Sequence, residues 1–224
     1  MRHVDVITLD GPAGSGKSTV SRLLARRIGY AYLDTGAMYR AIALAAKREG
    51  VLPDDRVALR HLCENIRLRF VTDQDPPRLL MGNEDISEEI RNPEMDMLSS
   101  TVSTVKEVRE AMSTLQRSIA RHVGKGLVAE GRDMGTVVFP EARCKILLTA
   151  SLEERASRRH RELLDRGKTV TKKEVMEGLK KRDYQDQNRS LAPLKAAPDA
   201  LILDTTGMGI EAVLRRLIAH VAAG

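Results

Sequence analysis

A glycine-rich loop between a strand and a helix constrains this chain more than any other feature. Residues 11–18 read G-P-A-G-S-G-K-S and fill every fixed position of the phosphate-binding pattern G-x-x-x-x-G-K-[S/T]. The apolar run at 4–9 predicts a strand, and the amphipathic run at 19–27 predicts a helix. Because a glycine loop that opens a helix presents backbone N–H groups to anions, we predict that the segment binds a nucleoside triphosphate.

Two side chains in this loop have distinct expected roles. Lys17 would reach the β- and γ-phosphates, and the Ser18 hydroxyl would ligate the Mg²⁺ that accompanies the nucleotide. The residues expected to hold the donor nucleotide are Gly11, Pro12, Ala13, Gly14, Ser15, Gly16, Lys17, Ser18 and Thr19.

The charge balance of the chain limits its partners. A formal charge of +6 and an isoelectric point near 9.5 suit an anionic ligand, and nucleic acid is also compatible with them. The chain has two Phe, four Tyr and no Trp, which leaves few rings on which single-stranded bases could stack. We therefore expect a small anionic ligand and no nucleic acid.

Cysteine usage and hydropathy predict where the protein works. Cys63 and Cys144 stand alone, without a C-x-x-C pair, and the five His residues show no metal-ligand spacing. No apolar run approaches the roughly 18 residues of a membrane span, and the N-terminus leads straight into the first strand. These features predict a cytoplasmic protein with no signal peptide and no membrane segment.

Alternating strands and helices predict the fold class. Short apolar runs at 30–33, 127–129, 145–149 and 201–204 are typical of buried parallel strands, and helical patterns lie between them. The chain is expected to be one domain, residues 1–224, with an α/β fold: a doubly wound parallel sheet that binds ligands at the carboxyl ends of its strands.

Two segments interrupt this pattern. Residues 62–92 contain an alternating strand at 66–71, a second at 78–81 and a turn at 82–83, which predicts an inserted antiparallel meander. Ser151 and Thr171, each with Glu three residues later, predict capping boxes for two helices that flank a basic stretch around 160–170.

A second anion site is needed if the chain is a kinase, and two motifs could supply it. Arg182, Asp186 and Arg189 are spaced by four and three residues, which places them on one helix face, although a solvated face of ion pairs is the alternative. The segment from Glu130 to Asp133 packs charges around a glycine directly after a buried strand, where ligands bind; a merely structural loop is the alternative. A guanine-binding N-K-x-D motif is absent, and the D-x-x-G at 204–207 is interpreted as a turn.

Taken in order, the motifs resemble the bacterial cytidylate kinases over essentially the whole chain. The matching segments are G-P-A-G-S-G-K-S-T at 11–19, D-T-G-A-M-Y-R at 34–40, G-R-D-M-G-T-V-V-F-P at 131–140, R-x-x-x-D-x-x-R at 182–189, A-P-L at 192–194 and D-A-L-I-L-D-T at 199–205. Departures are mild: Thr35 stands where many members have Ser, Glu130 where some have Asp, and the 110–130 stretch is slightly longer than in some relatives.

The resemblance implies a P-loop kinase fold with a helical lid at 155–171, and transfer of the ATP γ-phosphoryl to CMP or dCMP with Mg²⁺. The meander at 62–92 is then the nucleoside-monophosphate-binding insertion, and the protein is expected to be a monomer. Lys17, Arg132 and Arg182 are the implied catalytic residues. Arg155, Arg158 and Arg159 are implied to close over ATP, with solvated charge as the alternative.

The resemblance also assigns the acceptor. The phosphate of CMP would be held by Arg40, Arg132, Arg182 and Arg189; the cytosine by Ser100, Arg109 and Asp133; and the sugar by Asp186, with Thr35 nearby. Rival interpretations are a kinase of the same fold for UMP or a shikimate-like acid, and a non-enzymatic nucleotide-binding switch or nucleic-acid-binding ATPase. Asp133 argues against uracil, Asp186 and the meander argue against a small acid, and the missing N-K-x-D and scarce aromatic residues argue against the others.

Overall fold

The computed structural model describes residues 4–72 and 74–223, which form two compact units. Unit 1 comprises Met1–Asp34 and Ile119–Gly224, and unit 2 comprises Thr35–Ser118. Each unit has its own sheet.

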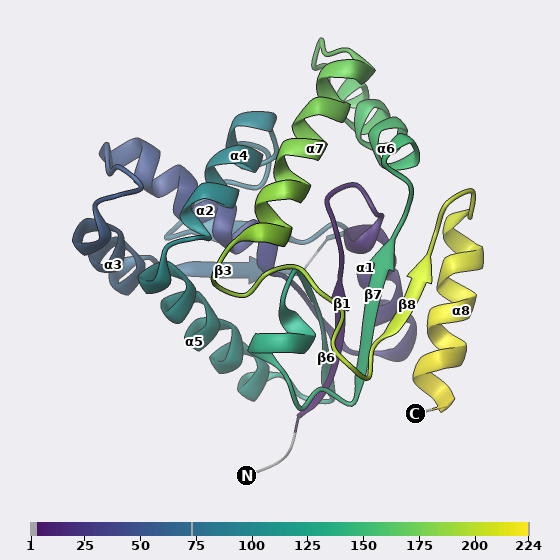
Figure 1. Ribbon diagram of the computed structural model, residues 1–224. Coiled ribbons are helices and arrows are strands. Elements are labelled where there is room, and N and C mark those ends of the chain that lie inside the picture. Colours follow the sequence, from purple (N-terminus) through teal and green to yellow (C-terminus); the bar gives the residue numbers. More distant parts are fainter. Residues whose placement is uncertain (1–3, 73, 224) are drawn as a thin grey trace. The chain divides into compact units, whose positions relative to one another are not determined.

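The sheet of unit 1 is five-stranded and parallel throughout, in the order β2-β6-β1-β7-β8 (Figure 1). Its strands are β1 (Asp5–Asp10), β2 (Ala31–Asp34), β6 (Gly126–Gly131), β7 (Cys144–Thr149) and β8 (Leu201–Asp204). The order confirms the predicted doubly wound sheet. Asp10 at the end of β1 is in register with Gly131 at the end of β6, so the segments that follow these two strands leave the sheet side by side.

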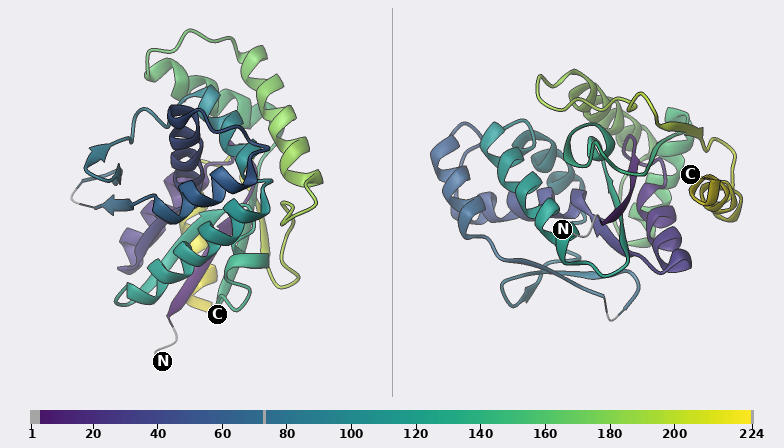
Figure 2. Two further views of the ribbon diagram at one scale, coloured as in Figure 1. Left: turned by 90° about the vertical axis from the view of Figure 1, so that its left-hand side faces the viewer. Right: turned by 90° about the horizontal axis from the view of Figure 1, so that it is seen from below.

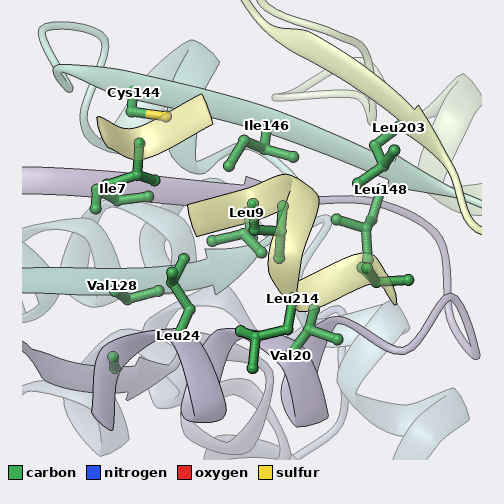
Figure 3. Close-up of a cluster of buried hydrophobic side chains, with 14 residues drawn as sticks. Ile7, Leu9, Val20, Leu24, Val128, Cys144, Ile146, Leu148, Leu203 and Leu214 are labelled. Carbon is green, nitrogen blue, oxygen red and sulfur yellow. The ribbon is translucent and has the colours of Figure 1, made fainter. Parts of the chain in front are cut away.

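One face of this sheet carries the apolar core of unit 1 (Figure 3). Ile7 and Leu9 of β1 pack with Leu24 of α1 (Lys17–Ile28) and Leu214 of α8 (Ile210–Ala223). Successive strand residues point to opposite faces, so Thr8 of β1 lies on the other side of the sheet. Burying each such Leu or Ile contributes roughly 1.5–3 kcal/mol, which anchors β1 firmly beneath the loop that follows it.

Helices α6 (Leu152–Asp165) and α7 (Lys172–Asn188) form an antiparallel hairpin, drawn in green in Figure 1. Thr171 and Glu174 form the full predicted capping box. At Ser151 the box prediction is half right: the Ser151 hydroxyl accepts from Glu154 N, but Ser151 N donates to Thr206 Oγ1, while the Glu154 carboxylate pairs with Arg158. The side chain of Glu154 is drawn to a guanidinium one helical turn away, so the reciprocal bond is replaced.

Unit 2 contains the predicted meander, a three-stranded antiparallel sheet in the order β3-β4-β5 that is drawn in blue in Figure 2. The strands are β3 (Leu68–Val71), β4 (Arg78–Met81) and β5 (Glu84–Asp85). They accompany α2 (Thr35–Glu49), α3 (Arg56–Asn65), α4 (Pro93–Val102) and the first part of α5 (Lys106–His122). Leu79 of β4 and Ile86 pack with Ala41 and Leu44 of α2, which gives the unit its own apolar core.

A short element after β6 was not predicted. Met134–Val138 form η1, a single π-helical turn in which Val138 N donates to Asp133 O and Phe139 N donates to Met134 O. π-Helical turns are rare and often lie at functional sites, and this one directly follows the predicted Arg132-Asp133 motif. Among the residues described, no helix combines the length and apolar character needed to cross a membrane.

Candidate active site

The phosphate-binding loop joins β1 to α1, and its glycines are required by its shape. Gly11, Gly14 and Gly16 have φ angles of 151°, 75° and 89°, which side-chain-bearing residues rarely adopt. A Cβ on Gly11 would lie 2.1 Å from the carbonyl oxygen of Leu148, and one on Gly14 would lie 2.9 Å from that of Arg155. The loop therefore keeps its curvature only with glycine at these positions.

Lys17, the first residue of α1, lies buried inside the loop. Its ammonium donates to the carbonyl oxygen of Pro12 at 2.8 Å, and its side chain is 6 % exposed. Burial and then the charge of Arg132 lower the pKa of Lys17 well below its ordinary value. A polyanion bound in the loop would supply the opposite charge that favours the ammonium form.

Ser18 and Glu130 bring two hard oxygen donors together at the same edge of the sheet. The Ser18 hydroxyl donates to Glu130 Oε2 at 3.0 Å, and the Tyr32 hydroxyl donates to the other oxygen of that carboxylate. Burial and then the charge of Asp34 raise the pKa of Glu130 above its ordinary value. A hydroxyl and a carboxylate fit Mg²⁺, which takes few protein ligands when substrate phosphates supply the rest. The sequence assigned Ser18 to the metal and placed Glu130 in a ligand-binding segment, but it gave Glu130 no metal role, because 112 residues separate the pair.

The arginines of α6 differ in what they contact. Arg155 is buried and donates to Ala13 O of the loop at 3.1 Å and to Ala150 O at 3.0 Å, and its Nη2 lies 2.7 Å from Asp183 Oδ2 of α7. Its guanidinium therefore joins the loop to both helices of the hairpin. The sequence had suggested an exposed lid position for this residue, and the buried contact could not be read from helix spacing.

Arg158 and Arg159 lie one turn farther along α6. Arg158 donates to Thr205 O at 2.8 Å and approaches Ser15 O of the loop at 3.4 Å, whereas Arg159 pairs with Glu162 at 2.7 Å. Arg158 thus lies at the loop.

The second anion site takes shape on α7. Arg132, just after β6, donates from Nε to Asp186 Oδ2 at 2.7 Å, and the Asp186 side chain is 4 % exposed. Burial acts to raise the pKa of Asp186, but the charges of Arg132 and Arg182 hold it below its ordinary value. The predicted Arg132 and α7 motifs are therefore brought together in one charged cluster.

Arg189 completes this cluster from the end of the helix. It is the C-cap residue of α7, so of the predicted helix face only Arg182 and Asp186 are helical. Its Nε donates to Ala192 O at 2.7 Å, and its Nη2 lies 3.7 Å from Asp133 Oδ1. The Arg189 and Asp133 side chains are 4 % and 3 % exposed, so this ion pair is buried.

Unit 2 carries the other predicted acceptor residues. Thr35 and Arg40 lie on α2 and Ser100 on α4, with Thr35 and Ser100 buried and Arg40 half-buried. Arg109 of α5 is buried, donates to Ser103 O at 3.2 Å, and places its guanidinium 5.8 Å from the centroid of the Tyr39 ring. The Tyr39 contact orients the guanidinium through a cation–π interaction.

Comparisons with known proteins agree on one family. A model of the cytidylate kinase family matches residues 7–223. The chain is 46 % identical over 209 residues to a cytidylate kinase of Geobacter sp. strain M21, covering 93 % of this chain and 89 % of that one. It is also 46 % identical over 220 residues to a cytidylate kinase of Azotobacter vinelandii, covering 97 % and 95 %.

A solved structure supports the fold alone. An uncharacterized protein from Eubacterium ventriosum is 11 % identical and aligns with a TM-score of 0.55 over 99 % of this chain and 100 % of its own.

Proposed function

The chain belongs to the cytidylate kinase family and phosphorylates CMP or dCMP with ATP, and we propose that the loop and the charged cluster of unit 1 carry out this reaction. The observation that carries the proposal is the register of β1 with β6. Asp10 and Gly131 end these strands side by side, so the donor loop at Gly11 and the cluster beginning at Arg132 leave the sheet from adjacent positions.

The donor side of the proposed site is built on the loop. Gly11, Gly14 and Gly16 leave the backbone close to the ATP phosphates, and Lys17 exchanges its contact with Pro12 O for the β- and γ-phosphates. Ser18 and Glu130 would hold the Mg²⁺, which neutralises phosphate charge when bound. The remaining loop residues, Pro12, Ala13, Ser15 and Thr19, shape the same cradle.

The acceptor side uses planar guanidinium groups. Arg132 and Arg182, together with Arg40 and Arg189, bind the CMP phosphate, because a guanidinium can donate to two oxygens of one phosphate. The ion pair of Arg132 with Asp186 fixes the guanidinium before substrate arrives. We propose that Asp186 also accepts from the sugar hydroxyls and that Thr35 contacts the nucleotide.

Phosphoryl transfer asks little covalent chemistry of the protein. The transferred group passes between two roughly aligned oxygens while charge spreads over its equatorial oxygens, so the protein mainly positions the two phosphates and stabilises charge. Lys17 supplies that stabilisation from a buried position and Arg132 and Arg182 from half-buried ones, where fixed charges act more strongly than in water.

Cytosine is proposed to be recognised by Asp133, Ser100 and Arg109. A buried carboxylate accepts a hydrogen bond from the N4 amino group of cytosine, whereas uracil presents the O4 acceptor there. Ser100 and Arg109 donate to the N3 and O2 acceptors of the ring. The burial of Asp133 makes an unpaired contact with uracil costly, by roughly 1–3 kcal/mol for each polar group left unsatisfied.

Residues 155–171 are proposed to act as a lid in which Arg158 and Arg159 contact ATP. Arg158 already lies at the loop, 3.4 Å from Ser15 O. Closure of such a segment excludes water and limits wasteful hydrolysis. Arg155 is proposed to act with them, and its bond to Ala13 O places its guanidinium at the loop. We propose that the protein does this as a monomer.

An acceptor panel tests the assignment. ADP release is measured with CMP, dCMP, UMP, AMP and shikimate, with the Lys17→Ala protein as the background control. CMP and dCMP should react about 10²- to 10⁴-fold faster than UMP. Comparable rates with UMP would remove Asp133 as the base reader, and activity on shikimate would favour the small-acid alternative.

A further inference from the structure

Asp10 joins the donor loop to the segment that carries the proposed base reader. It is the last residue of β1, directly before Gly11, and is 5 % exposed. One carboxylate oxygen accepts from Met134 N at 2.9 Å, and the other accepts from Gly135 N at 2.8 Å. Both donors belong to the π-helical turn η1, so two hydrogen bonds connect the end of β1 to the start of that turn.

The approach of η1 to β1 is close as well as hydrogen-bonded. A Cβ on Gly135 would lie 2.9 Å from Thr8 Oγ1, two residues before Asp10 on the same face of the strand. The distance is shorter than real Cβ contacts, so the missing side chain of Gly135 lets the turn lie against β1. The two hydrogen bonds and this steric fit fix the turn independently.

The residue held in place by these contacts is Asp133. Its peptide bond to Met134 contains one of the two N–H groups that Asp10 binds. Its own carbonyl oxygen accepts from Val137 N at 2.9 Å and from Val138 N at 3.2 Å. With its carboxylate 3.7 Å from Arg189, Asp133 is constrained along its backbone and at its tip.

We propose that Asp10 is a positioning residue that sets the placement of the Asp133 carboxylate and hence the choice of cytosine over uracil. The inference rests on the proposed role of Asp133. Two hydrogen bonds to a charged acceptor are the strong kind, and losing either would let the start of η1 move. Burial raises the pKa of Asp10 to about 6, with the N–H groups of Gly135 and Met134 acting in the opposite direction.

Two substitutions separate position from charge. Asp10→Asn keeps the size but turns a donor toward one of the two N–H groups, and Asp10→Glu keeps the charge but lengthens the side chain. If Asp10 positions Asp133, both variants lower the ratio of kcat/KM for CMP to that for UMP by about tenfold, with KM for ATP unchanged. Asp5→Asn, at the other end of β1, is the matched control and should leave the ratio unchanged.

Other results would overturn the proposal. A raised KM for ATP, or equal losses of kcat/KM for CMP and UMP, would show that Asp10 acts on the loop rather than on base choice. A normal ratio in both Asp10 variants would show that Asp10 has no effect on base choice. A normal ratio in Asp10→Glu alone would assign the effect to charge. Failure of both variants to fold would make Asp10 a structural residue only.

A double-variant comparison separates this inference from the function beneath it. If Asp10 works through Asp133, adding Asp10→Asn to Asp133→Asn leaves the CMP-to-UMP ratio at the value of Asp133→Asn alone. A normal ratio in Asp133→Asn alone would contradict the proposed base reader. If Asp133→Asn lowers the CMP-to-UMP ratio and the double variant lowers it further by the factor seen in Asp10→Asn alone, only the proposed role of Asp10 is contradicted.

Discussion

The phosphate-binding loop and the charged cluster of Arg132 with the residues of α7 are both proposed to bind phosphate, but one is formed by the backbone and the other by side chains. The loop is a backbone structure of consecutive residues whose shape depends on glycine at Gly11, Gly14 and Gly16. The cluster consists of side chains that meet across the fold, such as Arg132 with Asp186, 54 residues apart. A backbone site tolerates little change in shape, whereas a side-chain site can be altered one contact at a time.

The largest expected effect lies on the loop side. Lys17→Ala removes the one ammonium buried in the loop, and donors of this kind are typically worth roughly 10²–10³ in rate or more. Turnover should fall by at least that factor while circular dichroism shows a retained fold. Arg27→Ala, an exposed residue of the same helix, is the control. Near-normal turnover in Lys17→Ala would remove the loop from the mechanism.

A comparable loss should follow when the cluster is broken at α7, but with a different kinetic pattern. Arg182→Ala should lower kcat/KM for CMP by about 10²-fold and leave KM for ATP unchanged, because the guanidinium is proposed to bind the acceptor phosphate. Arg182→Lys should recover only part of the loss, since a point charge cannot donate in pairs. If the variant alters only thermal stability, the arginine is a surface charge rather than a phosphate ligand.

A smaller change is expected in the preference for CMP over UMP when Asp133 is replaced. Asp133→Asn replaces the proposed acceptor for the cytosine amino group, so activity on CMP should fall about tenfold more than activity on UMP. Kinetics with both acceptors give the ratio directly, and Asp199→Asn, an exposed carboxylate, serves as the control. An unchanged preference would place base recognition on another residue.

The smallest expected effect is on the pH dependence of stability, and it comes from Asp10, which lies directly before the loop and binds the start of η1. Because burial raises the pKa of Asp10 to about 6, the folded state binds its proton more tightly than the unfolded state. The stability contributed by this group is therefore complete below pH 4 or so and is lost as the pH rises through about 6, by about 1 kcal/mol between pH 5 and pH 7.

Urea unfolding at both pH values tests this. The difference in unfolding free energy between the wild type and Asp10→Asn should shift by that amount and with that sign. If the difference in unfolding free energy between the two proteins is the same at both pH values, Asp10 does not titrate between pH 5 and pH 7.

The contrast between a loop of consecutive residues and a cluster of residues distant in the sequence also explains how much the sequence could predict. The loop, its flanking strand and helix and the parallel strands follow from contiguous patterns, and the structure confirms the strands and the meander, whereas the strand order is known only from the structure. Other contacts join residues more than 100 positions apart, so no local sequence pattern predicts them. They are the hydrogen bond of Ser18 with Glu130 and those of Asp10 with Met134 and Gly135.

Helix spacing was informative but incomplete at the hairpin. It identified Arg182 and Asp186 as neighbours, yet it could not show that α7 ends before Arg189 or that Arg155 turns inward to Ala13 O. Both outcomes depend on tertiary contacts that compete with the helix surface for the same guanidinium groups. The π-helical turn at Met134–Val138 has no periodic signature at all.

We propose that donor and acceptor are bound by two separable structures, the backbone loop and the side-chain cluster. Calorimetric titration of Arg182→Ala with CMP and, separately, with a non-hydrolysable ATP analogue tests it most directly. CMP affinity should fall at least about tenfold, while affinity for the analogue should stay at the wild-type value. Loss of affinity for the analogue with CMP binding intact, or equal loss of both, would contradict it.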